Sequence, residues 1–150
     1  GLGLVIVGAL AFVAWLTESF TALAILVAIF GALLVTFYYN WYPARILIGD
    51  VGTLTIGATV AIAVIIGNYE YAGIIIIIPY LLDFVLKAAG GFPKSFGVLR
   101  DGKLYCPDDG PVGLAQLVMK IFGGISERGL VIVLLVLELA FAWLAILYYL

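Results

Sequence analysis

The stretch that decides the fold reads YYNWYPARILIGDVGTL, at residues 38–54. It interrupts a sequence that is otherwise almost hydrocarbon-like, and it places one carboxylate, Asp50, between two glycines. A carboxylate at a membrane boundary is costly unless it pairs, binds a cation or faces water. Gly49 and Gly52 let the backbone approach a phosphate closely, and the start of the following helix favours anions. The pattern indicates a metal-assisted phosphate site; the alternative is a solvated acid that stabilises the helix dipole.

The composition excludes an ordinary soluble domain. Hydrophobic residues make up 66% of the chain, whereas globular proteins contain about 45–50%. A membrane-spanning helix needs about 20 apolar residues, or about 17 at the short end. The stretches that qualify, or nearly qualify, are residues 2–16, 21–37, 53–67, 71–87 and 129–150. We predict an all-α polytopic membrane protein with about five transmembrane helices and a long loop before the last.

The basic residues predict the orientation of these helices. They are Arg45, Lys87, Lys94, Arg100, Lys103, Lys120 and Arg128. With five spans, all of them fall on one face, in the loops 38–52 and 88–128 or at the end of the fourth span. The opposite loops contain no Lys or Arg. Because cytoplasmic loops are enriched in Lys and Arg, we expect both loops, and Asp50 with them, to face the cytoplasm.

Residue types that are rare or absent narrow the chemistry. The chain has no histidine, which removes a histidine base or metal ligand from this segment, and its one cysteine cannot form an intrachain disulfide. Mg²⁺ usually takes one or two protein carboxylates and completes its shell with water and substrate phosphates. A single Asp beside a glycine-rich turn is consistent with this mode of Mg²⁺ binding. The chain begins at Gly1 inside an apolar run, so we expect it to be the C-terminal part of a larger polypeptide.

The long loop 88–128 has local structure of its own. Arg100-Asp101-Gly102-Lys103 predicts a hairpin turn between short strands. Residues 113–122 suit a short amphipathic helix that lies in the membrane interface. Ser126 is a candidate N-cap for the last span, and Thr53 for the third.

Several polar side chains near the loops are candidates for binding a substrate. Asn40, Tyr42 and Arg45 are placed to position a head group, and their alternative role is interfacial anchoring. Lys94, Arg100 and Lys103 are placed to bind phosphate oxygens. Their alternative role is to contact lipid head groups and to provide the positive charge that is typical of cytoplasmic loops.

Two acids fall inside predicted spans. Asp83 has Lys87 four residues later, a spacing that favours a helical ion pair. Glu138 has no local partner. Such acids also mark ion pathways, and a transporter is therefore a competing class of function.

The stretch from Asn40 to Leu54 resembles the N-x-x-P-A-x-x-F-x-G-D-x-G-[ST] signature of the polyprenyl-phosphate N-acetylhexosamine-1-phosphate transferases, glycosyltransferase family 4. Its Asn-Trp-Tyr-Pro form is closest to the dolichol-type and archaeal branch. Residues 123–130, GGISERGL, are similar to the segment before the last helix of that branch, and Gly102-Lys103-Leu104 resembles its loop. The cell-wall branch carries a histidine cluster in this loop, which is absent here.

The resemblance implies an enzyme that transfers N-acetylhexosamine-1-phosphate, with GlcNAc-1-phosphate expected, from a UDP-sugar to a polyprenyl or dolichyl phosphate, with release of UMP. This would be the first membrane step of lipid-linked glycan synthesis. By resemblance, Asp50 is the catalytic Mg²⁺ ligand, with Mn²⁺ as an alternative, and Leu47 borders the uracil pocket. Asn40, Arg45, Gly49, Lys94, Arg100 and Lys103 complete the predicted substrate site.

Further expectations concern partners and location. The expected partners are the UDP-sugar, the lipid phosphate, the bilayer and the N-terminal half of the same enzyme, with no nucleic acid; a homodimer stays open. The expected location is an archaeal plasma membrane or the endoplasmic reticulum membrane, with a cytoplasmic active site. Because the family's paired aspartates are missing from this segment, we expect it to be inactive alone. A non-catalytic assembly subunit is a third alternative.

Overall fold

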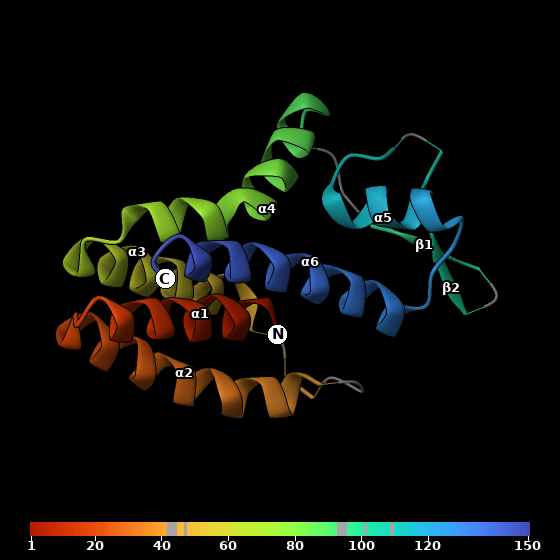
Figure 1. Cartoon of the computed structure of the whole chain (residues 1–150). Coiled ribbons are helices and arrows are strands. Elements are labelled where there is room, and N and C mark those ends of the chain that lie inside the picture. The colour runs from red at the N-terminus through yellow and green to blue at the C-terminus, as the bar shows by residue number, and fades with distance from the viewer. Residues whose placement is uncertain (42–44, 47, 93–95, 101, 109) are drawn as a thin grey trace. The chain divides into compact units, whose positions relative to one another are not determined.

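The computed structural model describes residues 1–41, 45–46, 48–92, 96–100, 102–108 and 110–150. Within these ranges the chain is mostly helical, with one short two-stranded sheet (Figure 1). The elements are α1 (Leu2–Leu16), α2 (Phe20–Asn40), α3 (Gly49–Gly67), α4 (Glu70–Ala89), β1 (Val98–Arg100), β2 (Lys103–Tyr105), α5 (Leu114–Phe122) and α6 (Glu127–Leu147). The predicted all-α membrane class is confirmed.

The apolar helices match the predicted spans closely. In the described part of the chain, α2, α3, α4 and α6 are long and apolar enough to cross a membrane. The fifth apolar helix, α1, has 15 residues and is therefore about 22 Å long, less than the roughly 30 Å of a bilayer core. The chain is an integral membrane protein, and its described residues form four long apolar helices and one short one.

The third span starts earlier than predicted. We expected it to begin at Thr53, with Thr53 as its N-cap, but α3 begins at Gly49 and its cap position is Ile48. The Thr53 hydroxyl instead donates a hydrogen bond to the Asp50 carbonyl, at 2.9 Å. The predicted loop 38–52 is correspondingly shorter, because α2 also continues to Asn40. Residues 49–52, Gly-Asp-Val-Gly, thus form the first turn of a helix. The low helix propensity of glycine does not prevent this, because propensity is only a weak preference.

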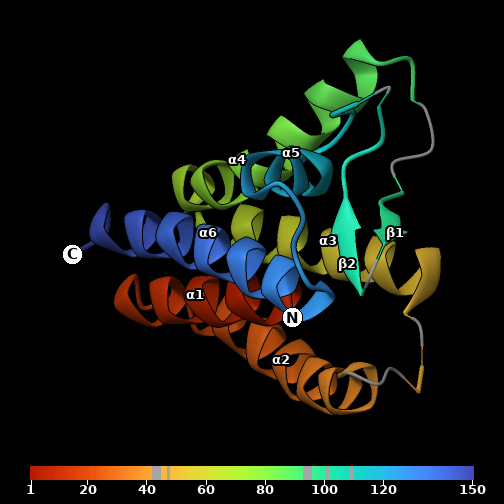
Figure 2. The ribbon, with the colours of Figure 1, turned by 90° about the vertical axis from the view of Figure 1, so that its right-hand side faces the viewer.

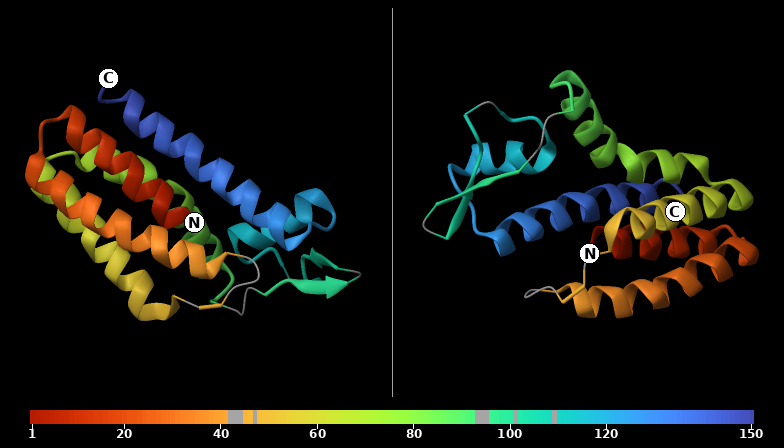
Figure 3. Two further views of the ribbon diagram at one scale, coloured as in Figure 1. Left: turned by 90° about the horizontal axis from the view of Figure 1, so that it is seen from below. Right: turned by 180° about the vertical axis from the view of Figure 1, so that it is seen from behind.

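The chain divides into two compact units, and the division falls inside α4 and α6. The first unit comprises Gly1–Ile76 and Glu138–Leu150. In it, α1 packs against α2 and α3, and α1 and α2 lie side by side as antiparallel neighbours (Figure 3). Its core is aliphatic and includes the fully buried Val7, Leu10, Val13 and Leu26.

Tyr69 fills the corner between α3 and α4. Asn68 adopts a left-handed conformation (φ 53°) after the end of α3, and the side chain of Tyr69 is fully buried. Gly67 has to lack a side chain, because a Cβ there would overlap the Tyr69 ring. The Ser19 hydroxyl donates a hydrogen bond to the Gly67 carbonyl, at 3.1 Å, and so joins the α1–α2 turn to this corner. Burial raises the pKa of Tyr69 to about 12.

The second unit, Ile77–Leu137, contains the end of α4, the hairpin β1–β2, α5 and the start of α6. The strands are antiparallel, with Arg100 opposite Lys103 and Leu99 opposite Leu104 (Figure 2). This confirms the predicted hairpin. Ser126 also caps α6 as predicted, because its hydroxyl accepts a hydrogen bond from the Gly129 N–H, at 3.2 Å.

The amphipathic helix predicted at 113–122 is α5, but part of its apolar side faces protein. Val118 and Met119 are buried with Leu130 of α6, and Leu104 and Ile125 pack against them. We expected this helix to bury its apolar face in the membrane interface. Val118 and Met119 instead belong to a small hydrophobic core that attaches the hairpin to the start of α6. Ile121 and Phe122 at the end of α5 are exposed, and the location of the helix in the membrane interface stays a prediction.

Candidate active site

Hydrogen bonds fold the segment after α2 back onto the helix end. The side-chain amide of Asn40 donates to the Ile46 carbonyl, at 2.6 Å. The Arg45 N–H donates to the Tyr39 carbonyl, at 2.9 Å. Asn40 therefore has a structural reason to be an amide at this position, because it closes the connection that leads to α3.

Asp50 lies in the first turn of α3, and it is exposed. Within the described part of the chain, its carboxylate has no hydrogen-bond or ion-pair partner. Gly49, just before it, has a φ of +63°, which glycine adopts at little cost. The positive φ sets the direction in which the chain enters the helix, and so the position from which the Asp50 side chain leaves it.

The start of α3 is suited to anions as well as to the Asp50 carboxylate. The first amides of a helix have no partner within it, and they carry partial positive charge. Ile48 at the cap position makes no side-chain hydrogen bond to these amides. A phosphate oxygen is the kind of group that satisfies them.

The cavity next to this segment is small. It has a volume of about 30 Å³ and is lined by residues of α1, α2 and α3, including Asn40, Ile48 and Ile56. This is room for about two water molecules, so the cavity does not accommodate a nucleotide. Asp50 is not among the residues that line it.

The hairpin of the second unit presents two cations together. Arg100 and Lys103 are cross-strand partners, so their side chains leave the same face of the hairpin. Both are exposed. Like charges directly opposite each other are unfavourable in a two-stranded ribbon, and a bound anion relieves that repulsion. The pair is therefore a candidate phosphate-binding element.

The predicted site residues are distributed over both units. Asn40, Arg45, Gly49 and Asp50 belong to the first unit, and Arg100 and Lys103 belong to the second. Leu47 and Lys94 lie outside the described residues, and so does Tyr42. Each described group is locally coherent, with an acid at a helix start in one unit and a pair of cations on a hairpin in the other.

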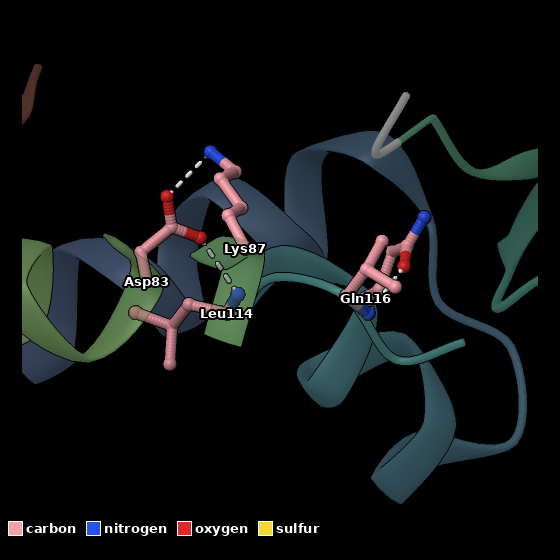
Figure 4. Close-up of polar contacts among 5 residues, drawn as sticks. Asp83, Lys87, Leu114 and Gln116 are labelled. Carbon is pink, nitrogen blue, oxygen red and sulfur yellow. Dashed lines mark hydrogen bonds and ion pairs between the residues drawn. The ribbon is translucent and has the colours of Figure 1, made fainter. Parts of the chain in front are cut away.

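The two acids predicted inside spans differ in their surroundings. The predicted pair of Asp83 with Lys87 is present, at 2.5 Å, and the second Asp83 oxygen accepts the Leu114 N–H, at 2.8 Å (Figure 4). Glu138 in α6 is only 1% exposed, and its Oε1 has no partner among the described residues. Among these residues, no group of three or more His, Cys, Asp or Glu side chains is placed to hold a metal ion.

Sequence reasoning missed Gln116 and the contact between Asp83 and Leu114. Gln116 lies on the buried side of α5, 1% exposed, and both of its side-chain groups are hydrogen-bonded. A polar residue on the apolar side of an amphipathic helix is a signal that was available. The Asp83–Leu114 contact joins residues 31 positions apart, and no local pattern indicates it.

Several helices long and apolar enough to cross a membrane, within the described part of the chain, define the class as a polytopic membrane protein. Comparison with known proteins identifies its relatives. Residues 1–68 match the family described as Glycosyl transferase family 4. The chain is thus related to this family, as its motif predicted.

Relatives match nearly the whole chain. A Saccharolobus solfataricus protein with the provisional name UDP-N-acetylglucosamine–dolichyl-phosphate N-acetylglucosaminephosphotransferase is 36% identical over 150 residues, which cover 97% of this chain and 46% of that protein. A Sulfolobus acidocaldarius protein with the same provisional name is 32% identical, over 99% of this chain and 46% of its own length. A phospho-N-acetylmuramoyl-pentapeptide-transferase of Enterococcus faecalis is 35% identical over 55% of this chain and 26% of its length. The chain therefore spans a little under half of the length of its two archaeal relatives.

Proposed function

We propose that this chain is part of an enzyme that transfers N-acetylglucosamine-1-phosphate from UDP-N-acetylglucosamine to a dolichyl or other polyprenyl phosphate. An oxygen of the lipid phosphate attacks the phosphorus that carries the sugar. The bond between that phosphorus and the oxygen of UMP breaks, so UMP leaves and a lipid-linked diphosphate sugar forms. The names of the archaeal relatives support this choice of substrates.

The observation that carries the proposal is the open Asp50 carboxylate at the start of α3. Its exposure, and the lack of a partner within the described residues, leave both oxygens available to a ligand. Asp83, by contrast, has a hydrogen-bond partner for each of its oxygens. The amides of the same helix turn favour phosphate, so the cation-binding group and the anion-binding group are neighbours.

The residues at Asp50 fit one part of a Mg²⁺ site. Mg²⁺ is commonly bound through one or two carboxylates, with waters and substrate phosphates as its other ligands. Asp50 supplies one such carboxylate. When bound, the ion would screen the diphosphate and stabilise negative charge on the departing UMP. Asn40 would hold the connection between α2 and α3, and Gly49 would set the direction of the Asp50 side chain.

Arg100 and Lys103 are the residues that we assign to the diphosphate. They are two exposed cations on one face of a short hairpin, and cationic side chains form charge-assisted hydrogen bonds with phosphate oxygens. Contacts of this kind position the nucleotide sugar and offset its charge, without taking part in bond breaking. The part of the enzyme outside this chain would supply the remaining acids. A homodimer remains a proposal about the whole enzyme.

The distribution of basic residues supports a cytoplasmic active site. All seven Lys and Arg residues fall in or beside the loops that carry Asp50 and the hairpin. The membrane would be an archaeal plasma membrane or that of the endoplasmic reticulum. The apolar spans would hold the prenyl tail in the bilayer, next to the loops.

The test is Asp50→Asn in the full-length protein, purified in detergent or nanodiscs. We expect UMP release in the presence of Mg²⁺ to fall by at least about 100-fold, because an amide is a much weaker ligand for a hard cation. The amount and monodispersity of the protein should not change. The matched control is Glu70→Gln, an exposed acid in the first turn of α4. Unimpaired UMP release by Asp50→Asn would reject the role of Asp50.

The transporter alternative is best tested at Glu138. Each Asp83 oxygen already accepts one hydrogen bond, from Lys87 and from the Leu114 N–H. Glu138 is buried and its Oε1 lacks a partner within the described residues. Ion flux into proteoliposomes that Glu138→Gln abolishes, without any change in UMP release, would favour transport over transfer.

A further inference from the structure

The Asp83 carboxylate connects two elements that are distant in the sequence. Its Oδ2 accepts a hydrogen bond from the Lys87 ammonium one turn later in α4, at 2.5 Å. Its Oδ1 accepts the backbone N–H of Leu114, at 2.8 Å (Figure 4). The side chain is 29% exposed. Asp83 therefore ties the end of α4 to a segment that begins 31 residues later.

Leu114 is the first residue of α5, so Asp83 performs the task of an N-cap from another helix. The cap position of α5 is Gly113, which has no side chain with which to bond the first amides. A carboxylate next to these amides is favourable, because the helix start carries partial positive charge. Lys87 holds the carboxylate from its other side. The position of α5 on α4 thus depends on one acid.

Gln116, in the first turn of α5, continues the connection to the hairpin. Its Nε2 donates to the Phe96 carbonyl, at 2.9 Å, and its Oε1 accepts the Val112 N–H, at 2.9 Å. Phe96 lies two residues before β1. Gly97 packs so closely against α5 that a Cβ there would overlap the Met119 sulfur. The chain that enters the hairpin is therefore fixed to α5.

The second strand is attached as well. The Leu104 N–H donates to the Ile125 carbonyl, at 2.8 Å, and the Ile125 N–H donates back, at 3.0 Å. Leu104 also packs on Val118 and Met119 of α5. Arg100 and Lys103 lie at the far end of this hairpin, beyond both attachments. Their position follows from the position of α5.

We propose that Asp83 and Gln116 are positioning residues, which fix α5 and thereby hold Arg100 and Lys103 where they bind the diphosphate of the nucleotide sugar. The inference rests on the proposed function, because it assumes that these two cations contact the substrate. Asp83 acts through the Leu114 amide, and Gln116 acts through the Phe96 carbonyl.

The test compares variants of the full-length enzyme by their KM for UDP-N-acetylglucosamine. Asp83→Leu removes both contacts and should raise this KM by about 10-fold to 100-fold, because displacement of a binding group by about 1 Å is enough for such a loss. The KM for the lipid phosphate should not change, and kcat should change less. Asp83→Asn keeps an acceptor for Leu114 but loses the ion pair, so its effect should be intermediate. Glu70→Gln is the matched control.

A double-mutant cycle separates positioning from general damage. Against a hairpin that carries Arg100→Gln and Lys103→Gln, Asp83→Leu should have almost no further effect on the KM, since its effect passes through those cations. Hydrogen exchange of residues 98–105 should also become faster in Asp83→Leu. Gln116→Glu keeps the shape and the Val112 contact but loses the donor to Phe96. It provides the same test if Asp83→Leu does not fold.

Each outcome has a distinct meaning. Additive effects in the cycle, or an unchanged KM in both Asp83→Leu and Gln116→Glu, would overturn the positioning inference alone. If Arg100→Gln with Lys103→Gln leaves the KM unchanged, the role proposed for the hairpin fails first, and the inference fails with it. A non-additive cycle together with faster hairpin exchange supports both.

Discussion

Asp50 and Asp83 are both single acids close to the end of an apolar helix, yet their surroundings are opposite. Asp50 is exposed at the start of α3, with no partner for its carboxylate among the described residues. Asp83 lies towards the end of α4, with one oxygen on Lys87 and the other on the Leu114 amide. Position near a membrane boundary therefore does not determine whether an acid is bonded within the chain. The contacts of its oxygens separate the two acids, and they make Asp50 the better candidate for binding a ligand.

The same contrast applies to the segments around the two acids. Backbone and amide hydrogen bonds close the connection from Asn40 to Asp50, and they leave the α3 amides uncapped. In the second unit, the corresponding amide of α5 is already occupied by Asp83. An anion has an available helix start at α3 and a blocked one at α5. This difference supports the proposal that a phosphate binds at the start of α3.

The largest expected effect is the difference between alanine substitutions of the two acids, one of which should remove activity and the other stability. Asp50→Ala should abolish activity, by at least about 100-fold, and change the free energy of unfolding by no more than about 0.5 kcal/mol, since the side chain is exposed and unbonded. Asp83→Ala should retain measurable kcat and destabilise the protein by about 1–3 kcal/mol, because it leaves the Leu114 amide without its acceptor. Activity assays and thermal denaturation in nanodiscs measure both quantities. Equal losses of stability in the two variants would remove the distinction.

The next effect concerns the hairpin cations. Arg100→Gln and Lys103→Gln should each weaken binding of UDP-N-acetylglucosamine by about 10-fold, which is about 1.4 kcal/mol. Folding should be unharmed, because removing one of two opposed like charges relieves repulsion. Calorimetric titration at two salt concentrations measures the affinity, and salt should weaken wild type more than the variants. Lys120→Gln, in the last turn of α5, is the matched cation; an equal effect there would indicate a general effect of charge.

Local sequence predicted the features that depend on local physics. Apolar runs predicted the spans, since a backbone in lipid must satisfy its own hydrogen bonds and does so as helices. Arg100-Asp101-Gly102-Lys103 predicted the hairpin, and Ser126 predicted the cap of α6, because turns and caps are decided within a few residues. The roles of Asp50 and of the other site residues stay predictions.

The features that sequence failed to predict depend on contacts between distant residues. Gly49 and Gly52 indicated a loop, but α3 begins at Gly49, so the predicted cap at Thr53 is wrong. The amphipathic pattern of residues 113–122 predicted the helix correctly, yet a pattern does not say whether its apolar side meets lipid or protein. Asp83 was paired correctly with Lys87, one turn away. Its bond to Leu114 was invisible because only the folded chain brings the two together.

A smaller effect should follow from the backbone at Gly49, and it tests how precisely Asp50 is placed. Gly49→Ala has open space for its Cβ, so the cost is conformational: about 1–2 kcal/mol for an L-residue at φ +63°. We expect lower activity at unchanged affinity for the nucleotide sugar, as the Asp50 side chain shifts. Gly57→Ala is the matched control in the middle of α3, also with open space, and should be neutral or stabilising by up to about 1 kcal/mol. Wild-type activity in Gly49→Ala would show that Asp50 tolerates displacement.

The smallest effect extends the comparison to a buried hydroxyl. The hydroxyl of Tyr69 has no hydrogen-bond partner within the described residues. Tyr69→Phe should therefore leave activity unchanged and stabilise the protein by about 1 kcal/mol or less, since a buried polar group without a partner is a net cost.

The same residue predicts a dependence of stability on pH. Burial raises the pKa of Tyr69 to about 12, and an acid whose folded pKa is raised contributes stability below its unfolded pKa that is lost as pH rises. Wild type should therefore lose stability between about pH 10 and pH 12 more steeply than Tyr69→Phe. Denaturation midpoints across this range measure the difference, with the exposed Tyr71→Phe as the control. If Tyr69→Phe is less stable than wild type, the hydroxyl is hydrogen-bonded. Tyr69 would then resemble Asp83, whose oxygens are bonded within the chain, rather than Asp50.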